Sequence, residues 1–175
     1  MSPIIKITAS LLIIMSCGMA GLIIAHSYAS RPDQLKALIY ALKMLETEIA
    51  YTLTPLPEAL FRVGKRVGGE IGEFFISVGT QLSQENVPTC GEVWDSNLAG
   101  LKESACLTPG DLGILRSFGY NLGLSDREDQ IKNLKLTQEQ LNNHLYSAEK
   151  LREKNQRMWR TVGFLAGLAV VFILY

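Results

Sequence analysis

The stretch from Ser125 to Arg160, SDREDQIKNLKLTQEQLNNHLYSAEKLREKNQRMWR, decides the fold. It contains no Gly or Pro, and the next helix-breaking residue is Gly163. Ser125 and Glu128 have the spacing of a capping box, with acidic residues in the first turn where the helix dipole favours them. One helix is therefore expected to run from Ser125 through Arg160. Its predicted buried stripe consists of Ile131, Leu134, Leu141, Leu145, Ala148 and Leu151.

The residues upstream of this helix also have helical patterns. Apolar residues at spacings of three and four predict an amphipathic helix over 32–53, and Thr54-Pro55 predicts a cap and first turn for a helix to about Val67. Further helices are expected over 70–84, from Thr89, and from Thr108 to Asn121. No segment shows the alternation of a strand bounded by hairpin turns. The predicted fold class is therefore all-α, a bundle of about six helices flanked by N- and C-terminal transmembrane helices.

The flanking transmembrane helices are predicted from the charge distribution. Residues 7–30 and 161–175 contain no Asp, Glu, Lys or Arg. As helices they would be roughly 36 Å and 22 Å long, against a hydrocarbon core of about 30 Å. We therefore expect an N-terminal transmembrane segment over 1–30, a helical bundle domain over 31–160 and a short C-terminal transmembrane segment over 161–175.

Other interpretations of the N-terminus are a cleaved signal peptide ending near Ser27-Tyr28-Ala29, a lipoprotein box at Cys17, and a buried core helix. The apolar run is longer than that of a usual signal peptide. Apolar residues continue after Cys17, where a lipidated chain should turn polar. A run of this length also disfavours a core helix. The transmembrane interpretation is favoured.

The cations that flank the two spans predict their orientation. Eight lie on the side of the bundle, against Lys6 alone on the side of the termini: Arg31, Lys36, Lys43, Lys150, Arg152, Lys154, Arg157 and Arg160. Positive residues favour the cytoplasmic side. The bundle domain is therefore expected in the cytoplasm.

The sequence shows no pattern of catalytic, cofactor or metal chemistry. The 17 basic and 17 acidic residues cancel, which disfavours nucleic-acid binding. No phosphate-binding loop is present, and Cys90 and Cys106 lack metal-ligand spacing and are expected to be small packing residues. His144 is expected on a solvated helix face. No catalytic residue, cofactor or metal is predicted, and the chain is predicted not to be an enzyme.

The remaining patterns are typical of association. Gly163 and Gly167 form a GxxxG pattern in the second span, and Gly21 and Ala25 belong to a stripe of small residues in the first. Such residues let membrane helices approach closely, although they are also common in ordinary spans.

Three stretches together resemble the stage III sporulation protein AB family of endospore-forming bacteria. They are LETEIAYTLTPLPEAL at 45–60, GLSDREDQ at 123–130 and RMWRTVGFLAGL at 157–168. The resemblance implies a component of the channel between mother cell and forespore, in the mother-cell membrane around the forespore. It also implies a bundle similar to the cytoplasmic domain of the F-type platform proteins of type II secretion and type IV pilus machines.

That analogy implies several partners: the membrane, the stage III protein AA-type secretion ATPase and other stage III channel proteins. Platform proteins contain two such helical domains, whereas this chain has room for one. Homo-oligomerisation or other channel proteins would supply the second.

The candidate partner interface is an acidic corner with neighbouring residues: Glu46, Glu48, Tyr51, Glu58, Arg62 and Asp126. One interpretation is that it receives a basic ATPase surface, and the other, which is favoured, is that these residues support helix ends and packing. A rival function is an extracytoplasmic helical-bundle sensor or channel-wall protein between two spans.

Overall fold

The computed structural model describes residues 19, 30–52, 54–84, 88–123 and 126–174 of the 175-residue chain. The chain divides into two compact units, one formed by residues 33–146 and the other by 1–32 with 147–175. The first unit is the helical bundle and contains every contact discussed below.

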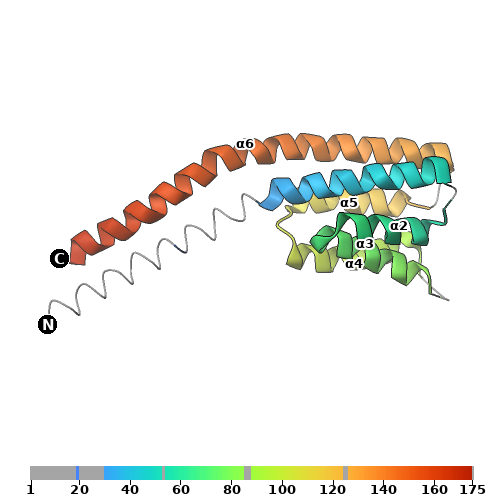
Figure 1. Ribbon diagram of the computed structural model, residues 1–175, viewed down its shortest axis with the longest axis horizontal. Helices are drawn as coiled ribbons and strands as arrows, with labels where there is room; N and C mark the ends of the chain where they lie inside the picture. The colour runs from blue at the N-terminus through green and yellow to red at the C-terminus, as the bar shows by residue number, and fades with distance from the viewer. Residues whose placement is uncertain (1–18, 20–29, 53, 85–87, 124–125, 175) are drawn as a thin grey trace. The chain divides into compact units, whose positions relative to one another are not determined.

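The described residues form helices and no strands (Figure 1). A helix over 30–47 continues into a π-helical turn, η1 (Glu48–Thr52). It is followed by α2 (Leu56–Val67), α3 (Gly69–Leu82), α4 (Cys90–Ser104), α5 (Pro109–Asn121) and α6 (Arg127–Leu174). The prediction of an all-α fold is confirmed, and the helices lie close to their expected bounds.

Two helices begin at capping boxes, at positions where the sequence predicts helix starts. At α4 the Thr89 side chain accepts a hydrogen bond from the Glu92 backbone N–H, and the Glu92 carboxylate accepts one from the Thr89 N–H. At α5 Thr108 and Asp111 exchange the same pair of bonds, with Pro109 in the first turn. These bonds satisfy backbone donors that have no partner within a helix.

Two predicted caps differ in the structure. Thr54 does not cap α2, because the helix begins at Leu56 after Pro55 and the Thr54 hydroxyl donates to Glu48 instead, at 3.2 Å. Ser125 lies outside the described residues, and the Asp126 carboxylate accepts the hydrogen bond of the Asp129 backbone N–H at 2.9 Å. The Asp126 carboxylate therefore caps the first turn of α6, in agreement with the structural interpretation of this residue.

Helices α2 and α3 approach closely because glycines face each other across their interface. A Cβ atom at Gly64 would lie 2.5 Å from the carbonyl oxygen of Gly72, and one at Gly79 would lie 2.7 Å from that of Pro57. Any larger residue would push the helices apart. This contact brings the start of α2 against the end of α3, where a cleft described below is located.

The core joins aromatic and aliphatic side chains. Trp94 of α4 is fully buried and makes edge-to-face contacts with three phenylalanines, Phe74, Phe75 and Phe118. The predicted apolar face of the first helix is half-buried at Ile49 and buried at Leu35, Leu38, Ile39, Leu42 and Leu45. In α6 the buried members are Leu134, Leu141 and Ala148, whereas Ile131 and Leu145 are half-buried. Leu151 is 44% exposed, so its predicted burial is wrong.

Within the part of the chain that the structure describes, no helix is both long and apolar enough to cross a membrane. The predicted N-terminal segment, with Gly21 and Ala25, lies outside the described residues except for Met19 and Ser30. The predicted C-terminal segment, with Gly163 and Gly167, is the last part of α6, which is helical to Leu174.

Candidate functional site

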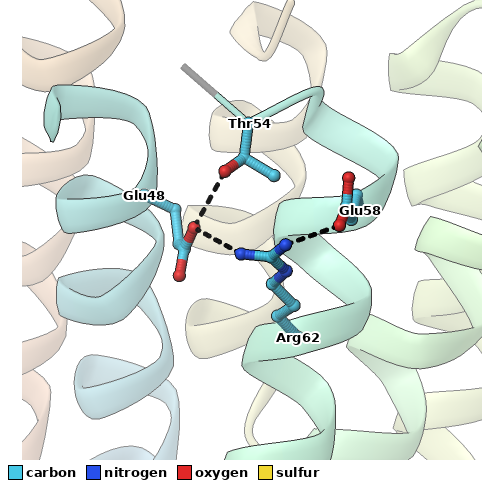
Figure 2. Close-up of polar contacts among 4 residues, drawn as sticks. All are labelled: Glu48, Thr54, Glu58 and Arg62. Carbon is cyan, nitrogen blue, oxygen red and sulfur yellow. Dashed lines mark hydrogen bonds and ion pairs between the residues drawn. The ribbon is translucent and has the colours of Figure 1, made fainter. Parts of the chain in front are cut away.

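The π-helical turn η1 places Glu48 beside the first turns of α2. Figure 2 shows the Glu48 carboxylate between the Thr54 hydroxyl and the Arg62 guanidinium, and Arg62 reaching Glu58 on its other side. The Arg62 nitrogens lie 3.9 Å from Glu48 and 2.6 Å from Glu58. The structure thus brings together three of the predicted interface residues, Glu48, Glu58 and Arg62.

This pairing changes the expected electrostatics of the corner. Arg62 lies between two carboxylates and compensates part of their charge, and the Glu48 side chain is only 15% exposed. Residues of a π-helical turn frequently occur at functional sites, but here the polar side chains mainly hold the turn against α2. A partner would therefore meet a largely compensated surface rather than an unpaired acidic patch.

Glu46 and Asp126 do not join this cluster. The Glu46 carboxylate accepts a hydrogen bond from the buried Gln138 side chain at 2.8 Å and lies 3.8 Å from the Lys135 ammonium, both on α6. Asp126 serves the start of α6. Glu46 ties the first helix to α6, whereas Asp126 caps α6 itself, and both roles agree with the structural interpretation of the corner.

Tyr51, at the end of η1, has an 82% exposed side chain. This exposure exceeds that of the other large hydrophobic residues described as exposed. Exposed aromatic residues are typical anchors of protein interfaces, because they bury a large area with few rotatable bonds. Tyr51 is thus the predicted interface residue most available to a partner.

A cleft of about 450 Å³ lies between the start of α2 and the end of α3. It is lined mainly by apolar atoms, from residues that include Pro55, Pro57, Phe61 and Gly79, with Glu58 also in the lining. The Lys65 ammonium lies 4.6 Å from the centre of the Phe61 ring. Sequence reasoning missed this cleft, since it depends on the close approach of two helices at Gly79.

His144 differs from its prediction. It is half-buried, and its Nδ1 lies 2.6 Å from Oδ1 of Asp111, which is fully buried at the start of α5. The prediction of a solvated residue is therefore wrong. The helical period assigned His144 to the polar face of α6, but that face is covered here by the first turn of α5.

The cysteines have different environments. Cys90 is half-buried, and desolvation raises the pKa of its thiol to about 11. Cys106 is exposed, so its predicted packing role is wrong. Its backbone N–H donates to the Gln34 side chain at 2.7 Å. Among the described residues, no three His, Cys, Asp or Glu side chains gather closely enough to hold a metal ion.

Comparisons with known proteins point to one family. The family model described as stage III sporulation protein AB matches residues 6–175. The stage III sporulation protein AB of Bacillus subtilis (strain 168) is 30% identical over 170 residues, which are 97% of this chain and 99% of that protein. A solved structure of stage III sporulation protein AB is similar with a TM-score of 0.67 and 29% identity, over 71% of this chain and 98% of that one.

Proposed function

Because this chain belongs to the stage III sporulation protein AB family, we propose that it is a non-enzymatic membrane platform component of the sporulation channel between mother cell and forespore. The observation that carries the proposal is the family match over nearly the whole chain. The helical bundle without strands in the described residues supports it, since a platform needs packing surfaces and no catalytic centre.

In this proposal the segments 1–30 and 161–175 cross the mother-cell membrane around the forespore. The charge-free runs and the flanking cations of the sequence support this arrangement, with residues 31–160 on the cytoplasmic side. Small residues in the spans, Gly21 and Ala25 in the first and Gly163 and Gly167 in the second, would pack against a second copy or other channel proteins.

The bundle then docks a stage III protein AA-type secretion ATPase. The corner supports this role through Tyr51 and the apolar cleft rather than through its carboxylates, because Arg62 pairs with both Glu48 and Glu58. Tyr51 precedes Pro55 of the cleft by four residues, which limits their separation to about 14 Å. One partner surface can therefore cover both.

Replacement of Tyr51 by Ala tests this docking. Loss of an aromatic anchor costs about 2 kcal/mol, so the affinity for the purified ATPase should fall roughly thirtyfold in a binding titration with the full-length chain. Tyr40→Ala is the matched control, because Tyr40 is also an exposed tyrosine, at 55%, on the helix that leads into η1. Equal affinities of the two variants would remove the corner from the ATPase interface.

Tyr51→Ala is a more specific test of docking than charge reversal of Glu46 and Glu48. Reversal would also break the contacts of these residues with Gln138 and Arg62 inside the bundle, so a loss of binding could reflect a damaged fold.

Topology is tested by labelling one introduced cysteine with a membrane-impermeant thiol reagent in sporulating cells. Gly100 is the chosen site, because it is exposed and a Cβ there meets nothing within 4 Å; Gly69 has a φ of 59° that disfavours cysteine. Cys17, Cys90 and Cys106 are replaced. Labelling only after permeabilisation supports a cytoplasmic bundle. Labelling of intact cells whose intermembrane space is accessible would favour the rival sensor or channel-wall role.

A further inference from the structure

The charges of the chain are divided unequally between its two compact units. The bundle unit over 33–146 carries ten basic and fifteen acidic residues, a net charge of −5. The other, here called the terminal unit, carries a net charge of +5. Its charged residues are basic Lys6, Arg31, Lys150, Arg152, Lys154, Arg157 and Arg160 and acidic Glu149 and Glu153. Such an asymmetry is typical of chains that bind an anionic surface.

The positive charge of the terminal unit lies next to the two charge-free runs of the sequence. Arg31 directly follows residues 7–30, and Arg160 directly precedes residues 161–175. The residues from Lys150 to Arg160, here called the basic segment, include five basic residues and one acidic residue. Clusters of about four to eight Lys or Arg residues beside a membrane span are typical of segments that bind anionic lipids.

The basic segment is helical, because α6 continues through it to Leu174. Lys150 and Lys154 are both exposed, and their spacing of four residues places them on one face of the helix. Glu149 and Glu153 have the same spacing but are offset by one residue, which is about 100° around the helix. One face of the segment is therefore richer in cations than the segment as a whole.

Leu151 adds an apolar side chain to the basic segment. It is 44% exposed, it follows Lys150 directly, and it precedes Lys154 by three residues. Lysines together with an exposed leucine are typical of helices that contact the boundary between lipid headgroups and acyl chains. A lipid surface therefore accounts for both the cations and the exposure of Leu151, whereas an acidic protein surface accounts for the cations alone.

We infer that the basic segment binds anionic phospholipid headgroups of the bilayer that anchors the chain. Lys150 and Lys154 place their ammonium groups at the lipid phosphates, and Leu151 contacts the outer part of the acyl layer. This inference rests on the membrane spans of the proposed function and adds the class of lipid that the chain selects. The bundle unit, with its net charge of −5, cannot supply this attraction.

Nanodiscs that contain the full-length chain test this inference. Cys17, Cys90 and Cys106 are replaced, and a polarity-sensitive fluorophore is attached to one cysteine introduced at Leu151 or, as a control, at exposed Gly100 on α4. The discs contain phosphatidylcholine with an increasing share of phosphatidylglycerol. The emission from position 151 should shift to shorter wavelength as that share rises, with no shift from position 100. Salt at about 1 M should reverse the shift, because the Debye length falls to about 3 Å.

Two double variants, made in the chain with the probe at position 151, assign the effect to the basic segment. Lys150→Gln with Lys154→Gln removes two of its cations. Lys132→Gln with Lys135→Gln is the matched control, because it removes two exposed lysines of the same helix within the bundle unit. The equilibrium constant for lipid contact should fall about thirtyfold in the first variant, as expected for two cations near an anionic surface, and stay unchanged in the second. Equal dependence on phosphatidylglycerol in the two variants would overturn the inference.

Co-elution of the chain with pure phosphatidylcholine discs at high salt tests the proposed spans separately, because salt screens electrostatic adsorption. A chain that does not co-elute contradicts the spans, and this inference with them. A chain that co-elutes but does not respond to phosphatidylglycerol overturns this inference alone. A shift that follows the number of chains per disc, and not the phosphatidylglycerol share, would assign the cations to the acidic bundle of a second copy and would also overturn it.

Discussion

The backbone of Gly119 on α5 lies directly against the indole ring of Trp94 on α4. A Cβ atom at Gly119 would overlap Cγ and Cδ1 of Trp94, and the indole has no room to move because Phe74, Phe75 and Phe118 surround it. The close approach of α4 and α5 therefore depends on the absence of a Cβ atom at Gly119.

Gly119→Ala should consequently destabilise the bundle by about 1–3 kcal/mol, the usual cost of overpacking a core. Thermal unfolding of the full-length chain in detergent, followed by circular dichroism, measures the change. Gly100→Ala is the control, because a Cβ there meets nothing and alanine favours the helix by about 0.5–1 kcal/mol. A melting temperature of Gly119→Ala equal to that of the parent chain would contradict the packing described here.

The contrast between Gly119 and the helix caps explains how far the sequence predicts the structure. The capping box of Thr89 and Glu92 and the Thr108-Pro109 helix start are local patterns, so the sequence alone identifies them. The contact of Gly119 with Trp94 joins two helices, and no periodicity reveals it. The same holds for Gly79 and hence for the cleft that it shapes.

The contacts of the candidate site also divide into local contacts, which spacing predicts, and contacts between elements, which it does not predict. Glu58 and Arg62 are one helical turn apart and their pairing follows from spacing, whereas Glu48 reaches Arg62 only through the fold. The prediction for His144 is wrong because a helical period assigns faces to one helix and carries no information on a neighbouring helix. The first turn of α5 covers that face and supplies Asp111.

The capping assignments lead to a second prediction. Thr108→Ala removes the acceptor for the Asp111 backbone N–H and should cost about 1 kcal/mol, a typical value for a lost N-cap. Thr54→Ala should cost less, because Thr54 caps no helix and its hydroxyl donates to Glu48 over 3.2 Å. Urea titrations of both variants give the comparison. A larger loss of stability in Thr54→Ala than in Thr108→Ala would show that Thr54 caps α2.

The ion pairs of the bundle should contribute unequally to stability. Arg62→Ala removes the ion pairs of Arg62 with Glu58 and with the mostly buried Glu48, and it should cost about 1 kcal/mol, the upper end for a partly exposed pair. Lys135→Ala removes a pair of 3.8 Å whose lysine is 67% exposed, and it should cost roughly 0.2 kcal/mol. Urea titrations at low and high salt separate the two, since screening weakens exposed pairs. Equal costs would show that the two pairs of Arg62 add no more stability than the exposed Lys135–Glu46 pair.

Cys90 and Cys106 should react with iodoacetamide at very different rates. With the pKa of Cys90 raised to about 11, only about 0.1% of its thiol is ionised at pH 8, and the thiolate is the reactive form. Cys106 is exposed, so it should be alkylated first. Peptide mass spectrometry over time, with Cys17 replaced by Ala, measures both rates in one sample. Faster alkylation of Cys90 would show that its thiol is not desolvated.

The same pKa shift predicts how stability depends on pH. The Cys90 thiol of the unfolded chain ionises near its ordinary value of 9.0, whereas in the folded chain it stays protonated to about 11. Ionisation therefore favours the unfolded state first, so the contribution of Cys90 is fully present below pH 9 and is lost as the pH rises from 9 to about 11. Cys90→Ala should flatten this part of the stability curve relative to the parent chain. An unchanged slope would assign the alkaline loss of stability to other groups and would remove desolvation as the cause of slow alkylation.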